Sequence, residues 1–397
     1  MSRALSLIEL GALDEGDVNA LAGRLGVGER QLRRLFRQHL GASPIAIAQT
    51  RRVLLAKQLI HETRLPMAEV AFAAGFGSIR RFNETFLALF GRAPVELRRD
   101  SRPEVSAGPH GEIALLLRFH PPYDWPAMVD FLRRRVIPGI EHVTAGSYAR
   151  SVQIDGVQGI VSVRPHDGNA LRATVRFPKL SALPVIVARL RRVFDLAADP
   201  VPIAAHLAKD AALASLVKAR PGLRVPGGWE GFELAIRAVV GQQITVSSAV
   251  RLAGRLVAAH GERLAVPDGD LTNVFPRPEV LAAADLTSLG IPRNRSAALS
   301  AVAAAAVADP HFFDAGYGLD DAVRRLRSMR GVGEWTAPYI ALRQLREPDA
   351  FPAADAGLMR AMASREGRER SVSELLDRAN LWRPWRAYAA QHLWASA

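Results

Sequence analysis

The chain has 397 residues and carries 52 Lys and Arg residues against 39 Asp and Glu residues, which gives a net charge of +13. Its hydrophobic content of 49% is typical of a globular protein and argues against a largely disordered chain. Because the sequence contains no cysteine, it excludes disulfides, cysteine nucleophiles, zinc fingers and cysteine-ligated iron–sulfur clusters, and we expect neither zinc nor a cluster.

No segment of the sequence predicts a membrane span or a secretory signal. Residues 1–10 contain one arginine and no long apolar run, and the Ala-rich run at 297–308 is too short to cross a bilayer. Together with the lack of cysteine, these features favour a cytoplasmic protein without a membrane partner. The arginine-dominated charge favours a polyanion such as nucleic acid as partner, because guanidinium groups match phosphates and base edges.

The first hundred residues predict two similar pairs of helices joined by one long helix. Apolar residues recur at helical spacing over 18–25, 29–40 and 67–74, with turns at Gly26 and at Gly75-Phe76-Gly77. Ser43-Pro44 opens the long helix, with serine as cap and proline in the first turn. Ser78 caps the last helix, in which Ile79, Phe82 and Phe86 are expected to face inward.

The second helix of each pair exposes polar side chains beside its buried edge. Such a helix fits the major groove of DNA, where arginine reads guanine and asparagine reads adenine. The predicted DNA contacts are Arg30, Arg33, Arg34 and Arg37 in the first pair and Arg80, Arg81 and Asn83 in the second. Exposed arginines also bind phosphate, so which of these residues contact bases stays open. A plain helical bundle with a solvated basic face is the alternative.

The duplicated arrangement resembles the AraC/XylS-type DNA-binding domain over about residues 10–99. The resemblance is carried by Leu32-Arg33-Arg34-Leu35-Phe36, Gly41-Ala42-Ser43-Pro44, Ala74-Gly75-Phe76, Phe82, Phe86 and Phe90-Gly91-Arg92-Ala93-Pro94. It implies a domain over residues 1–100 that reads a specific operator DNA or tethers the rest of the chain to DNA.

Residues 101–109 are rich in Pro, Gly and Ser and are interpreted as a linker. An α+β domain is predicted to follow, over residues 110–200. Its expected strands are 112–119, 148–154, 159–163 and 171–177, and its expected helices are 125–137 and 182–194. Four apolar residues from Leu171 to Phe177 alternate with polar ones, as a strand with one covered face requires. The order strand, helix, three strands, helix indicates an α+β layer.

From residue 201 to the end, the pattern predicts helices only, with turns at 221–228, 290–292 and 331–333. At the last turn, Gly331-Val332-Gly333 lets backbone N–H groups at a helix start approach a phosphate, a contact blind to base sequence. About twenty residues later, Asp355 stands in a loop ahead of a helix. This arrangement of a hairpin, a spacer and an aspartate resembles the helix-hairpin-helix DNA glycosylase superfamily. In that family the aspartate faces the anomeric carbon of a flipped nucleotide.

Further segments are similar to the AlkA type of 3-methyladenine DNA glycosylase II, so that the resemblance covers about residues 110–397. They are Pro122-Tyr123-Asp124-Trp125, Tyr148-Ala149-Arg150-Ser151, Phe194-Asp195-Leu196, the run from Gly231 to Gln243, Trp382-Arg383-Pro384-Trp385-Arg386-Ala387-Tyr388 and His392-Leu393-Trp394. The resemblance implies a multidomain fold, mainly α with one α+β domain, that ends in an all-α helix-hairpin-helix glycosylase domain over residues 201–397.

The resemblance implies a monofunctional N-glycosyl hydrolase that flips alkylated bases of the 3-methyladenine and 7-methylguanine type out of double-stranded DNA and releases them. Asp355 is the expected catalytic residue, which stabilises the oxocarbenium charge and helps to orient or deprotonate the attacking water, and Asp349 is the nearest alternative. Trp335, Tyr339 and Trp394 stand where the family places the aromatic walls for a cationic base. Relatives that cleave the strand carry a lysine at the position of Trp335, so no lyase step is expected.

The resemblance also points to a wedge residue and a cation. Gln243, with Gln242 beside it, stands at the position inserted into the DNA gap, where the family has an apolar side chain. Ala356 follows the aspartate where an aromatic can stand, which opens the pocket. No cofactor is required for the reaction. A monovalent cation, Na⁺ or K⁺, is expected at the hairpin on the backbone carbonyls of Arg327, Met329 and Val332.

Two alternatives stay open from the sequence. One is a transcription regulator of an alkylation response, in which the glycosylase part only recognises damage, and the other is a bifunctional glycosylase/lyase. Direct alkyl transfer is excluded, because the chain has no cysteine to accept the alkyl group. We expect a bacterial cytoplasmic protein associated with the nucleoid. We also expect the first domain to be separable from the chemistry, so that a chain beginning near Ser106 still releases bases.

Overall fold

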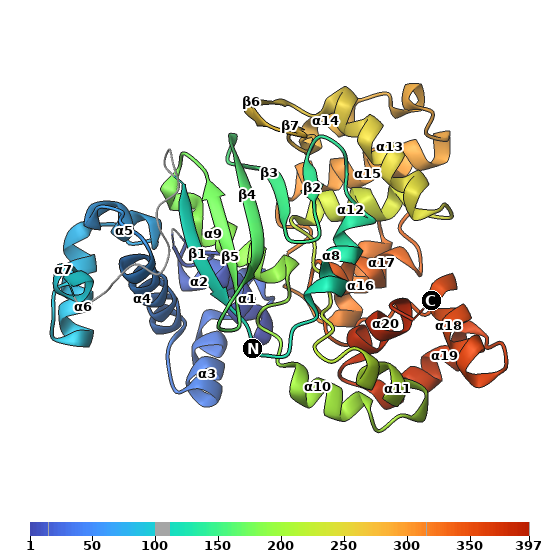
Figure 1. The fold of residues 1–397 in the computed structure, drawn as a ribbon, viewed down its shortest axis with the longest axis horizontal. Coiled ribbons are helices and arrows are strands. Elements are labelled where there is room, and N and C mark those ends of the chain that lie inside the picture. Colours follow the sequence, from blue (N-terminus) through green and yellow to red (C-terminus); the bar gives the residue numbers. More distant parts are fainter. Residues whose placement is uncertain (15, 100–111, 315, 397) are drawn as a thin grey trace.

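The computed structural model describes residues 1–14, 16–99, 112–314 and 316–396. The predicted linker at 101–109 lies outside these described residues. Figure 1 shows helices at both ends of the longest axis and a five-stranded sheet between them. In the part of the chain that the structure describes, no helix has the length and apolar character needed to cross a membrane.

The amino-terminal part is helical. Its helices are α1 (Ser2–Glu9), α2 (Val18–Arg24), α3 (Glu29–Leu40), α4 (Pro44–Glu62), α5 (Met67–Ala73), α6 (Ile79–Phe90) and α7 (Pro94–Arg99). The side chains of Ser43 and Ser78 accept a backbone N–H from the first turn of α4 and α6, which fixes where these helices begin. Phe82 and Phe86 are buried as expected. The inward position predicted for Ile79 is wrong: it is 41% exposed, because it opens α6 at the rim of the core.

The central part is built on an antiparallel sheet of order β1-β5-β4-β3-β2. Its elements are β1 (Ile113–Arg118), α8 (Trp125–Arg133), β2 (Glu141–Val143), β3 (Tyr148–Ile154), β4 (Val157–His166), β5 (Ala170–Arg176), the 3-10 turn η1 (Leu180–Ala182) and α9 (Leu183–Val193). Every predicted strand is present, and β3 has the predicted bounds. The short strand β2 was not predicted, because three residues are too few to display an alternating pattern. Leu115, Val161 and Val175 share one buried core with Ile186 and Leu190 of α9.

The carboxy-terminal part has one large core. Its elements are α10 (Pro200–Leu207), α11 (Ala211–Ala219), α12 (Gly231–Val240), α13 (Val246–His260), β6 (Arg263–Asp268), β7 (Leu271–Asn273), α14 (Pro278–Ala283), η2 (Leu286–Leu289), α15 (Arg293–Ala308), α16 (Leu319–Arg327), α17 (Thr336–Arg343), α18 (Ala356–Glu366), α19 (Val372–Ala379), η3 (Asn380–Trp382) and α20 (Arg386–Trp394). Trp382 is fully enclosed in this core, where its Nε1 donates to Asp210 Oδ2 at 2.9 Å.

The expectation of helices only after residue 201 is wrong at the hairpin formed by β6 and β7. Within the hairpin only Leu264 and Leu271 are well buried among the apolar side chains, so its hydrophobic alternation is too sparse to predict strands. The hairpin lies against β3 and β4, where Ile160 shares a small core with Leu264 and Leu271. Ser151 Oγ donates to the Asn273 carbonyl at 2.6 Å. The hairpin therefore joins the sheet to the carboxy-terminal helices.

The amino-terminal helices are not separate from the sheet. Ala56, Leu59 and Ile60 of α4 belong to the same buried cluster as Leu115 and Leu117 of β1. Alongside, Gln58 Nε2 donates to the carbonyl of Leu116 at 2.8 Å, and Glu62 Oε2 accepts the Leu116 N–H at 2.7 Å.

Two ion pairs extend this contact to the carboxy-terminal part. Arg3 Nε lies 3.2 Å from Glu347 Oε1, and Arg24 Nη2 lies 2.6 Å from Asp314 Oδ2. The first domain is therefore not an isolated unit in the structure, because its long helix completes the core of its neighbour; that a chain beginning near Ser106 still releases bases stays a prediction.

Candidate functional site

Asp355 stands immediately before α18 and has three hydrogen-bond donors. Its Oδ1 accepts the backbone N–H of Leu358 at 3.0 Å and the indole N–H of Trp394 at 2.9 Å, and its Oδ2 accepts the indole N–H of Trp335 at 2.7 Å. The carboxylate thus caps the helix, where the helix dipole favours a negative charge. The two indoles fix its orientation.

Asp349, the alternative acid, has a different environment. Its Oδ1 lies 2.8 Å from Arg386 Nε, and its Oδ2 pairs with Arg383 Nη1 at 2.5 Å. These arginines come from the segment that leads into α20, so Asp349 ties the loop before α18 to that helix. Asp349 does not line the cavity that Asp355 faces.

A cavity of about 1250 Å³ lies beside Asp355. The three predicted aromatics line it and contact one another: the rings of Trp335 and Tyr339 stack at 5.0 Å between centroids and 19° between planes, and Trp394 meets Tyr339 edge-on at 6.2 Å. Residues from three helices, at the starts of α17 and α18 and at the end of α20, therefore meet at one carboxylate. The arrangement suits a flat, electron-poor ring held beside a fixed negative charge.

Two arginines that the sequence did not single out, Arg343 and Arg135, also line the cavity. The Arg343 guanidinium lies 5.4 Å from the Tyr339 ring centre and 5.1 Å from the Trp394 ring centre. Burial lowers the pKa of Arg343 to about 10. Burial raises the pKa of Tyr339, but Arg343 and Arg135 outweigh it and hold that pKa below its ordinary value. The four-residue step from Tyr339 to Arg343 along α17 was the one sequence signal for this contact.

The hairpin between α16 and α17 has the expected tight turn. Gly331 has φ +80°, and a Cβ there would lie 2.3 Å from the Ala298 Cβ, so a side chain fits neither the backbone nor the space. Gly331 and Gly333 are exposed, whereas the Val332 side chain is buried under the turn. Arg327 is the last residue of α16, where the last carbonyls lack helical partners, and Met329 and Val332 follow it in the turn, where the Met329 carbonyl accepts the Val332 N–H at 3.2 Å.

The two glutamines after α12 have different roles in the structure. The Gln242 amide donates to the Gly331 carbonyl and to Thr336 Oγ1, both at 2.7 Å, and Arg295 holds the Gln242 carbonyl at 2.6 Å. In the structure the Gln242 side chain ties this loop to the hairpin, and its insertion into DNA stays a prediction. Gln243 is exposed at the cavity and has φ +56°, a left-handed backbone that presents its side chain at the loop tip.

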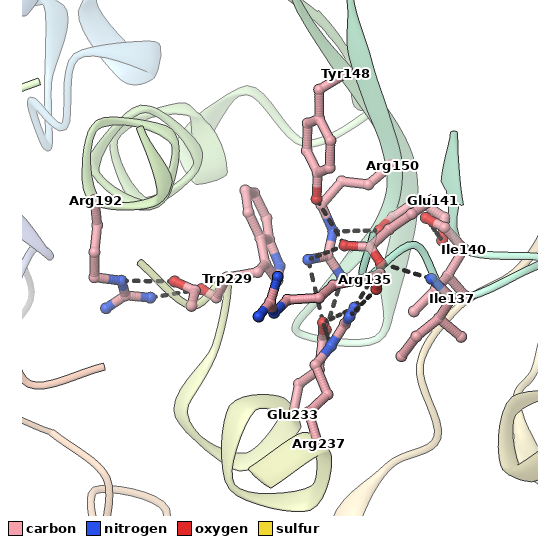
Figure 2. Close-up of polar contacts among 12 residues, drawn as sticks. Arg135, Ile137, Ile140, Glu141, Tyr148, Arg150, Arg192, Trp229, Glu233 and Arg237 are labelled. Carbon is pink, nitrogen blue, oxygen red and sulfur yellow. Dashed lines mark hydrogen bonds and ion pairs between the residues drawn. The ribbon is translucent and has the colours of Figure 1, made fainter. Parts of the chain in front are cut away.

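A buried ion cluster holds α12 against the sheet (Figure 2). Arg150 Nη2 of β3 lies 2.7 Å from Glu233 Oε2 of α12, and Arg237 of the same helix contacts both Glu233 and Glu141 of β2. Tyr148 donates to Glu141 at 2.9 Å. Burial raises the pKa of Glu233, but Arg150 and Arg237 outweigh it and hold that pKa well below its usual range. This cluster anchors the helix that leads directly into Gln242 and Gln243.

The predicted helix-turn-helix contacts divide into two groups. Arg33 pairs with Glu29 at 2.6 Å, and Arg80 pairs with Glu84 at 2.7 Å, each within its own helix. Exposed residues without an ion-pair partner among the described residues are Arg30, Arg34, Arg37 and Arg81, and Asn83 is exposed beside them. The second group is free to meet an anion. Within the described part of the chain, no three His, Asp or Glu side chains are placed to hold a metal ion.

Three family models match the chain in order. They are a helix-turn-helix domain over residues 21–100, the AlkA N-terminal domain over residues 114–230, and the HhH-GPD superfamily base excision DNA repair protein over residues 236–387.

Two curated relatives and one solved structure are similar to large parts of the chain. The probable bifunctional transcriptional activator/DNA repair enzyme AlkA of Mycobacterium tuberculosis is 38% identical over 398 residues, which cover all of this chain and 80% of the relative. DNA-3-methyladenine glycosylase 2 of Escherichia coli is 33% identical over 70% of this chain and 95% of its own length. The 3-methyladenine DNA-glycosylase structure from Archaeoglobus fulgidus has a TM-score of 0.62 at 21% identity, covers 71% of this chain and 97% of its own, and shows the fold alone.

Proposed function

This chain belongs to the AlkA-type DNA glycosylases of the HhH-GPD superfamily, fused to an AraC-type DNA-binding domain, and we propose that it is a monofunctional hydrolase that releases alkylated bases from double-stranded DNA. The proposed lesions are of the 3-methyladenine and 7-methylguanine type, of which 3-methyladenine stands in the name of the Escherichia coli relative. One observation carries the proposal: the Asp355 carboxylate is held by two indole N–H groups that belong to the walls of one cavity.

The proposed reaction breaks the bond between C1′ and the ring nitrogen of the flipped base. Alkylation gives that base a positive charge, so it leaves as a neutral molecule with the bonding electrons and needs no proton from the protein. Trp335, Tyr339 and Trp394 hold the flat cation by their faces, a contact worth about 0.5–2 kcal/mol per ring. Asp355 stabilises the positive charge that develops on the sugar. Water then attacks C1′ and gives its proton to Asp355, which leaves an intact strand with an abasic site.

The DNA contacts around the pocket follow from the hairpin and the loop after α12. The exposed glycines let the N–H groups at the start of α17 approach a phosphate. Gln243 is the proposed wedge that fills the gap left by the flipped nucleotide. A monovalent cation fits the carbonyl end of α16, since carbonyls without helical partners and the negative end of the helix dipole both favour it. When bound, it would stiffen the hairpin and add positive charge near the phosphate.

A base-release assay on methylated duplex DNA tests the proposal. Asp355→Asn should abolish release while abasic duplex is still bound, because the charge is removed and the amide oxygen can still cap α18. Asp349→Asn is the matched control and should keep single-turnover release, since Asp349 pairs with Arg383 and Arg386 away from the cavity. Rapid release by Asp355→Asn, or no release by Asp349→Asn with the fold intact, would move the catalytic role to another carboxylate.

The second candidate function is regulation by the amino-terminal domain, favoured by the exposed arginines on α3 and α6 that have no ion-pair partner among the described residues. In that case the glycosylase part would act as a damage sensor without turnover. Both functions act on chromosomal DNA, so we propose a location with the nucleoid in the bacterial cytoplasm.

A lyase step would need a lysine that forms an imine with the sugar, and position 335 holds a tryptophan instead. Covalent trapping with borohydride should therefore give no protein–DNA adduct, and a stoichiometric adduct would contradict the monofunctional assignment.

A further inference from the structure

We propose that one chain holds two separate segments of double-stranded DNA at the same time, one at the lesion pocket and one at α3 and α6. The inference rests on the proposed function, because it takes the pocket as one DNA site and the arginine-bearing helices as another. It adds an activity that neither site has alone, the bridging of two duplexes by a single protein molecule.

The α6 part of the second site lies at the opposite end of the molecule from the pocket, and α3 lies between α6 and the pocket along the longest axis (Figure 1). Figure 1 shows α6 at the left end and α3 at the lower left, whereas α17, α18 and α20, which carry the pocket residues, lie at the right. The sheet stands between α6 and these helices. A compact chain of this length is roughly 50 Å across. That is several times the screening length of about 8 Å at physiological salt, so two bound duplexes would barely repel each other.

The two sites cannot swing toward one another, because the amino-terminal helices are docked at several points. Gln58 and Glu62 bind both backbone groups of Leu116, and α4 shares the buried core of β1. A second contact is made by α5, whose Val70 and Ala71 share that core with Ala182 of η1 and Leu183, the first residue of α9.

The ion pairs from Arg3 to Glu347 and from Arg24 to Asp314 add contacts to the carboxy-terminal part. Since these contacts involve both the sheet and loops of the carboxy-terminal part, the relative position of the two sites is a property of the fold.

One short duplex cannot occupy both sites in this arrangement. DNA of about 24 bp is nearly straight, because its bending persistence length is roughly 150 bp. To touch both α6 and the pocket, it would have to wrap around the sheet and its helices. A duplex at the pocket therefore leaves the α3 and α6 arginines open to a second segment, either on another DNA molecule or far along the same one.

The test uses two intact duplexes of different mass. One is about 24 bp long and carries a tetrahydrofuran abasic analogue for the pocket; the other is undamaged, random in sequence and about 40 bp long. Mass photometry of the full chain with both duplexes at low salt should reveal a complex of one protein and two duplexes. A chain that only ever carries one duplex, or two-duplex complexes that always contain two chains, would overturn the inference.

Paired variants locate the second site. The double variant Arg34→Ala/Arg81→Ala should still form the one-duplex complex with the abasic probe but form about fivefold or more less of the two-duplex complex, because each removed arginine can neutralise one phosphate. The control Arg118→Ala/Arg164→Ala removes the same charge from exposed positions on β1 and β4 and should behave as the wild type. An equal reduction in both variants would contradict the assignment to α3 and α6.

Base release from methylated DNA, measured on the same preparation, separates this inference from the proposed function. Release without any two-duplex complex overturns bridging and leaves the glycosylase assignment intact. A two-duplex complex without release supports bridging and contradicts catalysis.

Discussion

At the scale of single residues, Asp355 is both a helix cap and the proposed catalytic residue. The same carboxylate ends a loop by capping α18 and faces the cavity between two indoles. A helix cap alone would need one oxygen and one backbone N–H. The two further donors come from Trp335 at the start of α17 and from Trp394 at the end of α20. Capping α18 does not require either of them.

Trp394→Phe should slow single-turnover base release by about tenfold to a hundredfold, because it keeps an aromatic face and removes one of the donors that orient Asp355. The control is Trp385→Phe, a change to a partly buried tryptophan that packs against the same core and does not line the cavity. It should leave the rate nearly unchanged. Wild-type kinetics in Trp394→Phe would mean that Trp335 and the Leu358 N–H suffice to hold the carboxylate.

His392 predicts a pH dependence of stability. Burial, reinforced by Arg220, lowers its pKa to about 4 from an ordinary value of 6.5. Between about pH 6.5 and pH 4, His392 is therefore mostly protonated in the unfolded chain and mostly neutral in the folded chain. Because the unfolded state binds more protons there, the free energy of unfolding decreases as the pH falls through this window. The expected decrease is about 2 kcal/mol by pH 5, where most carboxylates are still ionised. Urea unfolding of the wild type and of His392→Gln between pH 7 and 5 measures it, and parallel curves would contradict the prediction.

At the scale of elements, α12 links a buried ion cluster to the loop that carries the proposed wedge, Gln243. Glu233→Gln should lower the free energy of unfolding by about 3 kcal/mol, because it leaves Arg150 and Arg237 buried with a weaker partner. Glu279→Gln, on an exposed carboxylate in the first turn of α14, is the control and should change stability by less than about 0.5 kcal/mol. A similar small effect of both changes in urea unfolding would show that Arg150 and Arg237 are satisfied by Glu141 and solvent.

Elements with a local cause were predictable, and elements with a tertiary cause were not. Ser43 and Ser78 predict where α4 and α6 begin, because their side chains accept a backbone N–H from the first turn of each helix. The hairpin of β6 and β7 packs against Ile160 of β4. This contact is distant in the sequence, so the local residue pattern could not predict the hairpin. At the candidate site, the motif around Gly331 and Asp355 named two segments that the structure brings together beside one cavity.

The roles of Arg343 and Gln242 could not be predicted in the same way. They depend on which backbone and ring atoms meet after folding.

At the scale of the whole molecule, the sequence suggested parts joined by a linker, and the structure shows a shared core. The apolar residues Leu59 and Ile60 of α4 looked like the interior of a small helical domain, but they also belong to the core that includes β1. Helical spacing shows that a face is apolar and says nothing about which neighbour covers it.

Deleting residues 1–105 should lower the melting temperature by several degrees, since it uncovers β1 and removes the ion pairs of Arg3 and Arg24. The single-turnover rate at low temperature should stay within a few-fold, because no pocket residue is removed. Binding to long duplex DNA should weaken, and the slope of log K against log salt should flatten by roughly 0.9 for each phosphate that the shortened protein no longer neutralises. An unchanged slope and melting temperature would mean that the domain supplies neither DNA binding nor stability.

The contact of α4 with Leu116 has a consequence for the solubility of the sheet. Strand β1 has a neighbour on one side only, and an open strand edge is a template on which strands from other molecules can assemble into fibrils or precipitates. Gln58 and Glu62 engage the outward N–H and carbonyl in the middle of this edge, and Glu62 also brings a negative charge to it. We therefore expect this helix of the AraC-type DNA-binding domain to hinder assembly of other strands on the β1 edge.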